Sequence, residues 1–237
     1  MRVGLDLDGV GFPFVTEFKK LLRRNLSARP GFMEHEFGVN PTELMSKLHG
    51  QPRSWSWFKH QWGMTPDQFN GIFRMLVGQG LFAQAAPRDG YRALCSELIE
   101  AGHEVFIVTN RAVPGVEEKA IADTEGWIDR WDIPHTKLVI TADKTSVPTD
   151  VFLDDYDGNV RDVFDRGRSE NGKLTIPILY DRTWNQPDQP EGVTYHLADN
   201  HILYGPYAPE SGKFPGAYRL FSHDQVLKFI LTRPPHD

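Results

Sequence analysis

Two aspartates near the start of the chain, Asp6 and Asp8, have the residue type and spacing for acid–base or covalent chemistry. They end a short apolar run that alternates as a β-strand does, and Gly9 follows them. Because strand side chains repeat every two residues, both carboxylates are expected to point the same way, roughly 6–7 Å apart. That separation suits two carboxylates acting on either side of one small group. The alternative interpretation is a strand that ends in a polar turn, since Asp and Gly are common in turns.

Polar residues also stand at the ends of three later apolar runs that are typical of buried strands. They are Thr109 and Asn110 at the end of 105–109, Asp143 and Lys144 after 138–141, and Asp154 and Asp155 after 151–153. Helical patterns separate these runs, which favours an α/β fold with a parallel sheet and right-handed crossovers. Ligands of such sheets bind beyond the carboxyl ends of the strands, so all four groups are expected at one edge.

Carboxylates gathered at one sheet edge repel one another, by about 4 kcal/mol per pair at 4 Å and an effective dielectric of 20. A positive charge must therefore hold them together. Mg²⁺ is the natural candidate, because it binds carboxylate, water and phosphate oxygens. Lys144 would supply a second positive charge for a phosphate group, and Thr109 a neutral hydroxyl donor.

These residues carry a resemblance to a known family. The set Asp6-Leu-Asp8-Gly9-Val10, Thr109-Asn110, Lys144 and Asp154-Asp155 resembles the four motifs of the haloacid dehalogenase (HAD) superfamily of phosphohydrolases. The runs 140–145 and 151–155 are similar to those of the 5'(3')-deoxyribonucleotidases and their bacterial and phage relatives. The resemblance covers roughly residues 1–185 and the last helix. It implies a Rossmann-like HAD core with a parallel sheet and a small helical cap inserted after the first strand.

The resemblance also implies a role for each motif residue. Asp6 would be the nucleophile that forms an aspartyl phosphate, and Asp8 would protonate the leaving oxygen and then activate water. Mg²⁺ would be held by Asp6, the backbone carbonyl of Asp8 and Asp155, with Asp154 as an auxiliary carboxylate. The residues that would bind the transferring phosphoryl group are Thr109, Asn110 and Lys144.

The chain departs from the family pattern at three places. The second motif reads Thr109-Asn110-Arg111 where deoxyribonucleotidases usually have Thr-Ser-Pro, so Arg111 is expected either to contact the substrate or to be a solvated loop charge. Residues 11–14 differ at the entrance to the cap. The segment from about Trp184 to Gly216 resembles an insertion, which could carry an oligomer contact, as in a homodimer, or part of the pocket.

The element pattern divides the chain into a core, residues 1–28 and 85–237, and a helical cap, residues 29–84. Amphipathic spacing predicts a helix from Phe14 to Leu26, and Thr65 and Pro66 mark the start of another. A strand at 176–180 is expected near a sheet edge, because Pro177 cannot donate to a ladder.

The cap is rich in aromatic residues, which suits recognition of a planar base by stacking. The candidates are Trp55, Trp57, Phe58 and Trp62. The alternative is that these rings form the cap's own small hydrophobic core.

Composition sets the wider class. The chain has 237 residues and a formal charge of −6, which gives no basic footprint for a long nucleic acid. Its single cysteine, Cys95, is expected to be a buried helix residue and fits a reducing compartment. The sequence has no apolar run long enough to predict a membrane span. A cytoplasmic protein with a small phosphate monoester as its partner is therefore expected.

Together these features predict a Mg²⁺-dependent phosphomonoesterase that acts on nucleoside 5'-monophosphates, deoxyribonucleotides above all, through an aspartyl phosphate. Two alternatives stay open. One is a HAD phosphatase for a sugar phosphate or another small metabolite, and the other is a non-catalytic nucleotide- or metal-binding HAD module.

Overall fold

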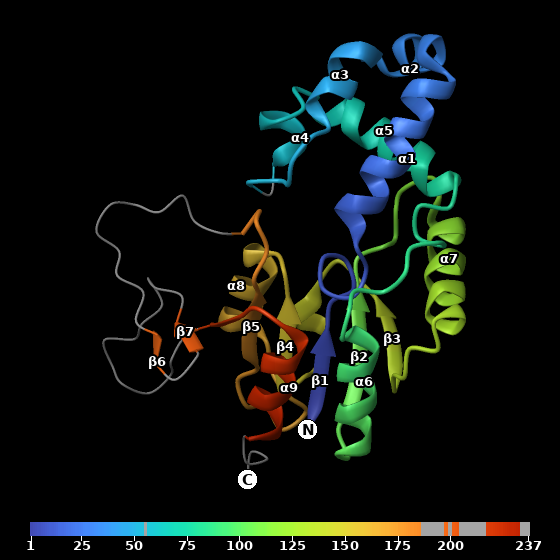
Figure 1. Cartoon of the computed structure of the whole chain (residues 1–237). Coiled ribbons are helices and arrows are strands. Elements are labelled where there is room, and N and C mark those ends of the chain that lie inside the picture. Colours follow the sequence, from blue (N-terminus) through green and yellow to red (C-terminus); the bar gives the residue numbers. More distant parts are fainter. Residues whose placement is uncertain (55, 186–196, 199–200, 204–216, 233–237) are drawn as a thin grey trace.

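The structure, a computed structural model of the chain, has an α/β core with a helical cap above it (Figure 1). It describes residues 1–54, 56–185, 197–198, 201–203 and 217–232. None of the helices in these ranges has the length and apolar character needed to cross a membrane.

The core is built on one sheet, in which β1 lies between β2 and β4. The strands are β1 (Arg2–Leu5), β2 (Glu104–Thr109), β3 (Lys137–Ile140), β4 (Val151–Asp154), β5 (Ile176–Tyr180), β6 (Leu197–Ala198), β7 (His201–Leu203) and β8 (Tyr218–Leu220). Their order is β3-β2-β1-β4-β5-β8-β7-β6, and the run from β3 to β8 is parallel. The predicted parallel α/β sheet is confirmed, and β7 and β6 extend it as antiparallel strands.

Helices cover the sheet. They are α6 (Tyr91–Glu100), α7 (Glu117–Arg130), α8 (Asp157–Arg166) and α9 (His223–Leu231). Helix α6 packs against β2 and α9, and α8 packs against β4 and β5. Figure 1 shows α6 and α9 side by side over one face of the sheet. Cys95 is buried in α6, as expected.

The prediction that 176–180 lies near an edge is wrong, because β5 pairs with β4 on one side and β8 on the other. Pairing with β8 begins only at Ile178, one residue beyond Pro177. The missing N–H of the proline is therefore tolerated at the start of a strand, where it costs little of the ladder.

The cap consists of helices inserted between β1 and α6. They are α1 (Phe14–Ala28), α2 (Pro30–Phe37), α3 (Pro41–Lys47), α4 (Trp57–His60) and α5 (Pro66–Gly78). Helix α5 begins as predicted, with Thr65 and Gln68 forming a reciprocal capping box. Helix α1 packs against α2, α3 and α5. We therefore propose that the cap begins at Phe14 and not at residue 29.

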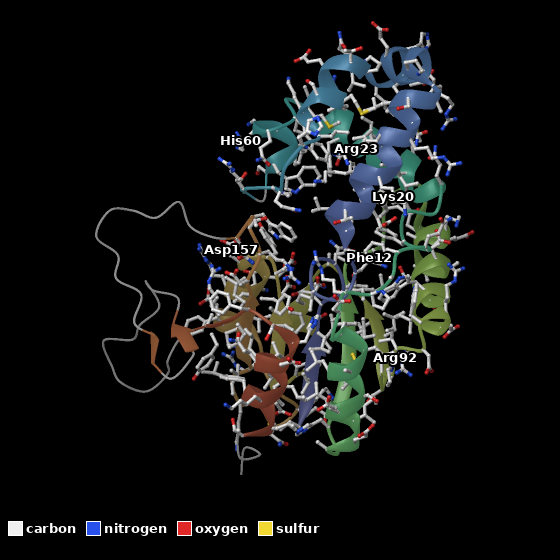
Figure 2. All side chains as sticks on the ribbon, in the orientation of Figure 1. Phe12, Lys20, Arg23, His60, Arg92 and Asp157 are labelled. Atoms are coloured by element: carbon white, nitrogen blue, oxygen red, sulfur yellow. The ribbon has the colours of Figure 1, made fainter. Side chains whose placement is uncertain are left out.

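The loop after β1 leads from the core into the cap, and Phe12 within it lies at the junction of the two (Figure 2). The loop is tight, because the amides of Gly11 and Phe12 both donate to the carbonyl of Leu7, at 2.8 and 2.6 Å. Gly9 adopts φ +75°, and a Cβ added there would lie 1.8 Å from Oδ2 of Asp155. Glycine is therefore required both by the backbone and by the neighbouring carboxylate.

We expect Gly9→Ala to destabilise the protein more than Gly102→Ala, as measured by urea unfolding. Gly102 has a similar φ of +82°, yet nothing lies within 4 Å of the position of its added Cβ. The free energy of unfolding should fall by about 1 kcal/mol in the Gly102 variant, through backbone strain alone. It should fall further in the Gly9 variant, because the side chain of Asp155 must also move. Equal losses would contradict the proposed close approach.

Candidate active site

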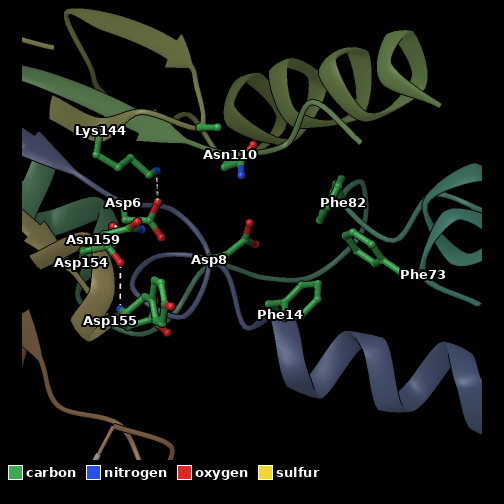
Figure 3. A pocket seen from close by; sticks show the side chains of 12 residues that line it. Asp6, Asp8, Phe14, Phe73, Phe82, Asn110, Lys144, Asp154, Asp155 and Asn159 are labelled. Carbon is green, nitrogen blue, oxygen red and sulfur yellow. Dashed lines mark hydrogen bonds and ion pairs between the residues drawn. The ribbon is translucent and has the colours of Figure 1, made fainter. Parts of the chain in front are cut away.

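A cavity of about 310 Å³ lies where the carboxyl ends of the strands meet the cap. Figure 3 shows acidic side chains and Lys144 on its core side and three phenylalanines on its cap side. The residues that line it are Asp6, Asp8, Phe14, Phe73, Phe82, Asn110, Ala142, Lys144, Asp154, Asp155, Tyr156 and Asn159. The cavity therefore has a charged half and an aromatic half.

Three buried carboxylates form the charged centre of the cavity. Asp6, Asp154 and Asp155 each offer an oxygen within 4.8 Å of the others, and each side chain is nearly inaccessible to water. Burial raises the pKa of Asp6 against the opposing attraction of Lys144. Burial, with the charge of Asp6, raises the pKa of Asp154 to about 8. Burial and the two neighbouring carboxylates raise the pKa of Asp155 well above its ordinary value. The site thus disfavours its own ionised form in the absence of a cation.

Hydrogen bonds fix the two carboxylates that follow β4. The amide of Tyr156 donates to Oδ1 of Asp154 at 2.8 Å, and Nδ2 of Asn159 donates to Oδ2 at 2.9 Å. The indole N–H of Trp184 donates to Oδ2 of Asp155 at 2.9 Å. Trp184 opens the segment for which the sequence left two alternatives, an oligomer contact or part of the pocket, and residues 186–196 lie outside the described residues. The bond to Asp155 places Trp184 at the site, although the sequence did not single out this residue or this contact.

Lys144 lies beside Asp6, as expected from its position after a strand. It stands in the 3₁₀ turn η1 (Lys144–Ser146), which Asp143 caps by accepting a hydrogen bond from the amide of Thr145 at 3.0 Å. The Lys144 ammonium donates to Oδ1 of Asp6 at 2.6 Å and to the carbonyl of Val108 at 2.5 Å. The short turn therefore delivers a buried positive charge to the carboxylate proposed as nucleophile.

Thr109 and Asn110 end β2 at the same edge. Asn110 is exposed and lines the cavity, whereas Thr109 is fully buried. The Thr109 hydroxyl has no hydrogen-bond partner within the described part of the chain. A buried hydroxyl without a partner is costly, so this group is suited to a ligand oxygen.

Arg111 differs from both expectations, because it is neither a solvated loop charge nor a wall of the cavity. It is fully buried, and its guanidinium binds both carboxylate oxygens of Asp8, with Nε to Oδ2 at 3.0 Å and Nη2 to Oδ1 at 2.6 Å. The assignment of Arg111 to the base pocket is therefore corrected. Sequence alone could not reveal this pair, whose members are 103 residues apart.

A second cavity, of about 210 Å³, adjoins the first and shares Asp8, Phe14, Phe73 and Asp155 with it. We call it the aromatic chamber. The remaining residues that line it are Gly9, Val15, Trp57, Phe58, Phe69 and Trp184. Of the predicted base-pocket residues, Trp57 and Phe58 lie in this chamber, while Trp62 lines a separate cavity and Trp55 lies outside the described residues. Trp62 instead packs on Trp57, with ring centroids 4.3 Å apart.

Sequence reasoning missed three phenylalanines of the aromatic chamber. Phe14 begins α1, and Phe69 and Phe73 are one turn apart on α5, stacked with centroids 6.0 Å apart. Their helical spacing was visible in the sequence. The face of α5 that turns to the site was not, because it depends on how α5 packs against α1.

The donor set fits a hard dication. Carboxylate oxygens are the ligands that Mg²⁺ prefers in proteins, and Asp6, Asp154 and Asp155 can converge on one ion. A bound dication would also offset the burial and the mutual repulsion that raise their pKa values. Lys144 alone leaves this buried group with an excess of negative charge.

Comparison with known proteins agrees with the fold and with the motifs. The family model described as "5' nucleotidase, deoxy (Pyrimidine), cytosolic type C protein" matches residues 1–191. A protein of Chlorobaculum tepidum with the name "Putative 5'(3')-deoxyribonucleotidase" is 27% identical over 168 residues, which are 70% of this chain and 74% of that protein.

Solved structures with a similar fold are more distant in sequence. A structure described as a "predicted phosphatase from Clostridium acetobutylicum" is 16% identical, covers 97% of both chains and has a TM-score of 0.52. A HAD-superfamily hydrolase from Geobacter sulfurreducens is 13% identical, covers 96% of this chain and 98% of that chain, and has a TM-score of 0.45.

The capped parallel sheet and its acidic edge, together with the family match, define a HAD-type phosphatase. The family match spans most of the chain, including every motif residue named above. The chain belongs to the 5' nucleotidase, deoxy (pyrimidine), cytosolic type C family. The resemblance to deoxyribonucleotidases seen in the sequence is thereby confirmed.

The raised pKa values predict a pH-dependent response to magnesium. Without metal, folded Asp154 holds its proton up to about pH 8, whereas the unfolded chain releases it near the ordinary value of 3.8. The contribution of Asp154 to stability is therefore full below about pH 4 and is lost as the pH rises through 8. We expect Mg²⁺ to raise the midpoint of thermal unfolding more at pH 8 than at pH 5.5, because protons compete with the ion at the lower pH.

Two variants control this measurement, which is a thermal scan with EDTA or Mg²⁺. Asp154→Asn should weaken the response to Mg²⁺ and raise the stability of the metal-free protein at pH 8. Asp132→Asn should behave as the wild type, because the Asp132 side chain is 84% exposed and lies outside the acidic group. A magnesium shift of the same size at both pH values would refute the coupling.

Proposed function

We propose that the protein is a Mg²⁺-dependent phosphomonoesterase for nucleoside 5'-monophosphates, with deoxyribonucleotides as the favoured class. The observation that carries the proposal is the junction of two cavities. A buried acidic site with a lysine shares Asp8 and Asp155 with an apolar, aromatic chamber. A nucleotide has the same division, with an anionic phosphate at one end and a planar base at the other.

The residues of the charged half take the roles of a covalent phosphatase. Oδ2 of Asp6 attacks phosphorus, the bond to the leaving nucleoside oxygen breaks, and the protonated carboxyl of Asp8 gives that oxygen its proton. Water then attacks the aspartyl phosphate, its proton passes to Asp8, and inorganic phosphate leaves. Lys144 holds Oδ1 of Asp6 at 2.6 Å, so Oδ2 is the oxygen left for attack.

A bound Mg²⁺ would be held by Asp6, Asp154 and Asp155, and it would supply charge to neutralise the phosphoryl oxygens. The backbone carbonyl of Asp8 is a further proposed ligand. Lys144, Asn110 and the unpartnered hydroxyl of Thr109 would bind the same phosphoryl group. Lys144 is already held by Asp6 and the carbonyl of Val108, and donors fixed before the substrate arrives lower the barrier to phosphoryl transfer.

The aromatic chamber supports recognition of a base by its ring and not by its edge. Its lining is largely apolar, and its rings come from separate parts of the chain, with Trp57 and Phe58 in α4 and Trp184 after β5. A sugar phosphate presents hydroxyl groups that this lining cannot satisfy, and their burial would cost free energy. The chamber therefore favours a nucleotide over the sugar-phosphate alternative.

We expect phosphate release from deoxyribonucleoside 5'-monophosphates, dependent on Mg²⁺ and abolished by EDTA and by Asp6→Asn. The assay measures inorganic phosphate from a panel of deoxy- and ribonucleotides, pyrimidine and purine, with sugar phosphates beside them. Comparison of pyrimidine with purine nucleotides tests whether this protein prefers the pyrimidines that the description of the matched family names. Phosphate release from sugar phosphates alone would support the proposed mechanism but contradict the proposal that nucleotides are the substrates.

We also expect Phe58→Leu to raise KM for nucleotides about 5- to 150-fold, which corresponds to roughly 1–3 kcal/mol for one lost stacking contact. Turnover of p-nitrophenyl phosphate should change much less. Phe32→Leu is the matched control, because Phe32 is an exposed cap phenylalanine that lies outside both cavities. Equal KM values for wild type and the Phe58 variant would remove this ring from the base pocket.

A further inference from the structure

We propose that Arg111 is the positioning residue of Asp8, and that it acts on the reaction only through this carboxylate. The inference rests on the proposed function, because it assumes that Asp8 is the acid and base of a phosphatase. It gives a role to Arg111, the charged residue of the second motif, whose neighbours Thr109 and Asn110 are the expected phosphate contacts.

The contact between the two side chains is a two-point fork. Nε and Nη2 of Arg111 each donate to a different oxygen of Asp8, at 3.0 and 2.6 Å. The Arg111 side chain is 0% exposed, whereas 27% of the Asp8 side chain remains accessible. A planar guanidinium that binds both oxygens fixes the rotation of the carboxylate as well as its position, which a lysine cannot do.

The guanidinium is itself held on all sides. Its Cζ lies 4.4 Å from the ring centroid of Phe12 and 4.1 Å from that of Phe82. Nη1 donates to the hydroxyl of Thr124 at 3.3 Å, and that hydroxyl donates to the carbonyl of Ala120 at 2.7 Å. Stacking fixes the plane of the guanidinium, and Thr124 fixes its rotation within that plane.

This arrangement suits a residue that transfers a proton twice. A carboxylate offers about four lone-pair sites, so the fork leaves others for a leaving oxygen or a water molecule. The fork holds the side chain of Asp8 in one orientation when it gives its proton to the leaving oxygen and is left as a carboxylate. The same carboxylate then takes a proton from the attacking water. Because Arg111 is paired with Asp8, Lys144 is the cation among the residues that line the first cavity.

The test compares two substrates that differ in their need for an acid. The leaving nucleoside oxygen of deoxythymidine 5'-monophosphate needs a proton, whereas p-nitrophenolate leaves without one. We expect Arg111→Lys to lower kcat/KM for the nucleotide about 100-fold, within the range seen for general acid catalysis, and that for p-nitrophenyl phosphate at most a few-fold. Arg92→Gln, a change on the exposed face of α6, should alter neither.

A double-mutant cycle separates a positioning role from a general structural one. If Arg111 acts through Asp8, Arg111→Lys should cause no further loss of nucleotide kcat/KM in an Asp8→Asn background. Losses that multiply would overturn the proposal, and so would equal losses on both substrates in the single variant. Absence of any wild-type phosphate release would instead be a failure of the proposed phosphatase function.

A second variant serves if Arg111→Lys does not fold. Thr124→Val removes the hydroxyl that accepts from Nη1 while keeping the shape of the side chain and the fork to Asp8. We expect a loss of a few-fold in kcat/KM that is confined to the nucleotide. A folded Thr124 variant that loses activity equally on both substrates, or that keeps full nucleotide activity, would contradict the proposal.

Discussion

The mutual repulsion of three buried carboxylates is the constraint on which the rest of the site depends. Asp6, Asp154 and Asp155 lie within 4.8 Å of one another at the ends of β1 and β4, and burial makes each of them harder to ionise. The positive charge of Lys144 offsets part of this negative charge at Asp6. Hydrogen bonds from Asn159 and Trp184 stabilise the carboxylates of Asp154 and Asp155. The arrangement costs stability, and a dication held among the three carboxylates would offset that cost.

Asp8, the second aspartate of the first motif, has different electrostatic surroundings from the three buried carboxylates. Asp8 is neutralised by its own buried arginine, while Asp6 shares a lysine that also faces the cavity. Two aspartates that are two residues apart therefore have different electrostatic surroundings. This difference is what separate roles in nucleophilic attack and proton transfer require.

Local signals in the sequence were enough to predict β1 to β5, the main helices and the acidic edge, but not β6, β7 and β8. The strand ends could be read from apolar runs, and α5 from Thr65 and Pro66, because these depend on neighbouring residues. The fork between Arg111 and Asp8 could not be read, since Phe12, Phe82 and Thr124 assemble around it from distant segments. The bond from Trp184 to Asp155 could not be read for the same reason. The interior place of β5 depended on β8, which follows about forty residues later.

The central position of β1 has a consequence for how the chain folds. Val3 pairs with Val105 in β2 and with Val151 in β4, so the strand that precedes Asp6 is synthesised long before either neighbour. Closing such long loops is slow, whereas the cap helices α1 to α5 contact one another within the single stretch 14–78. The cap can therefore form early, while β1 stays an apolar segment with two open edges. During synthesis these edges stay unpaired until β2 and β4 have been made, which leaves the segment open to aggregation.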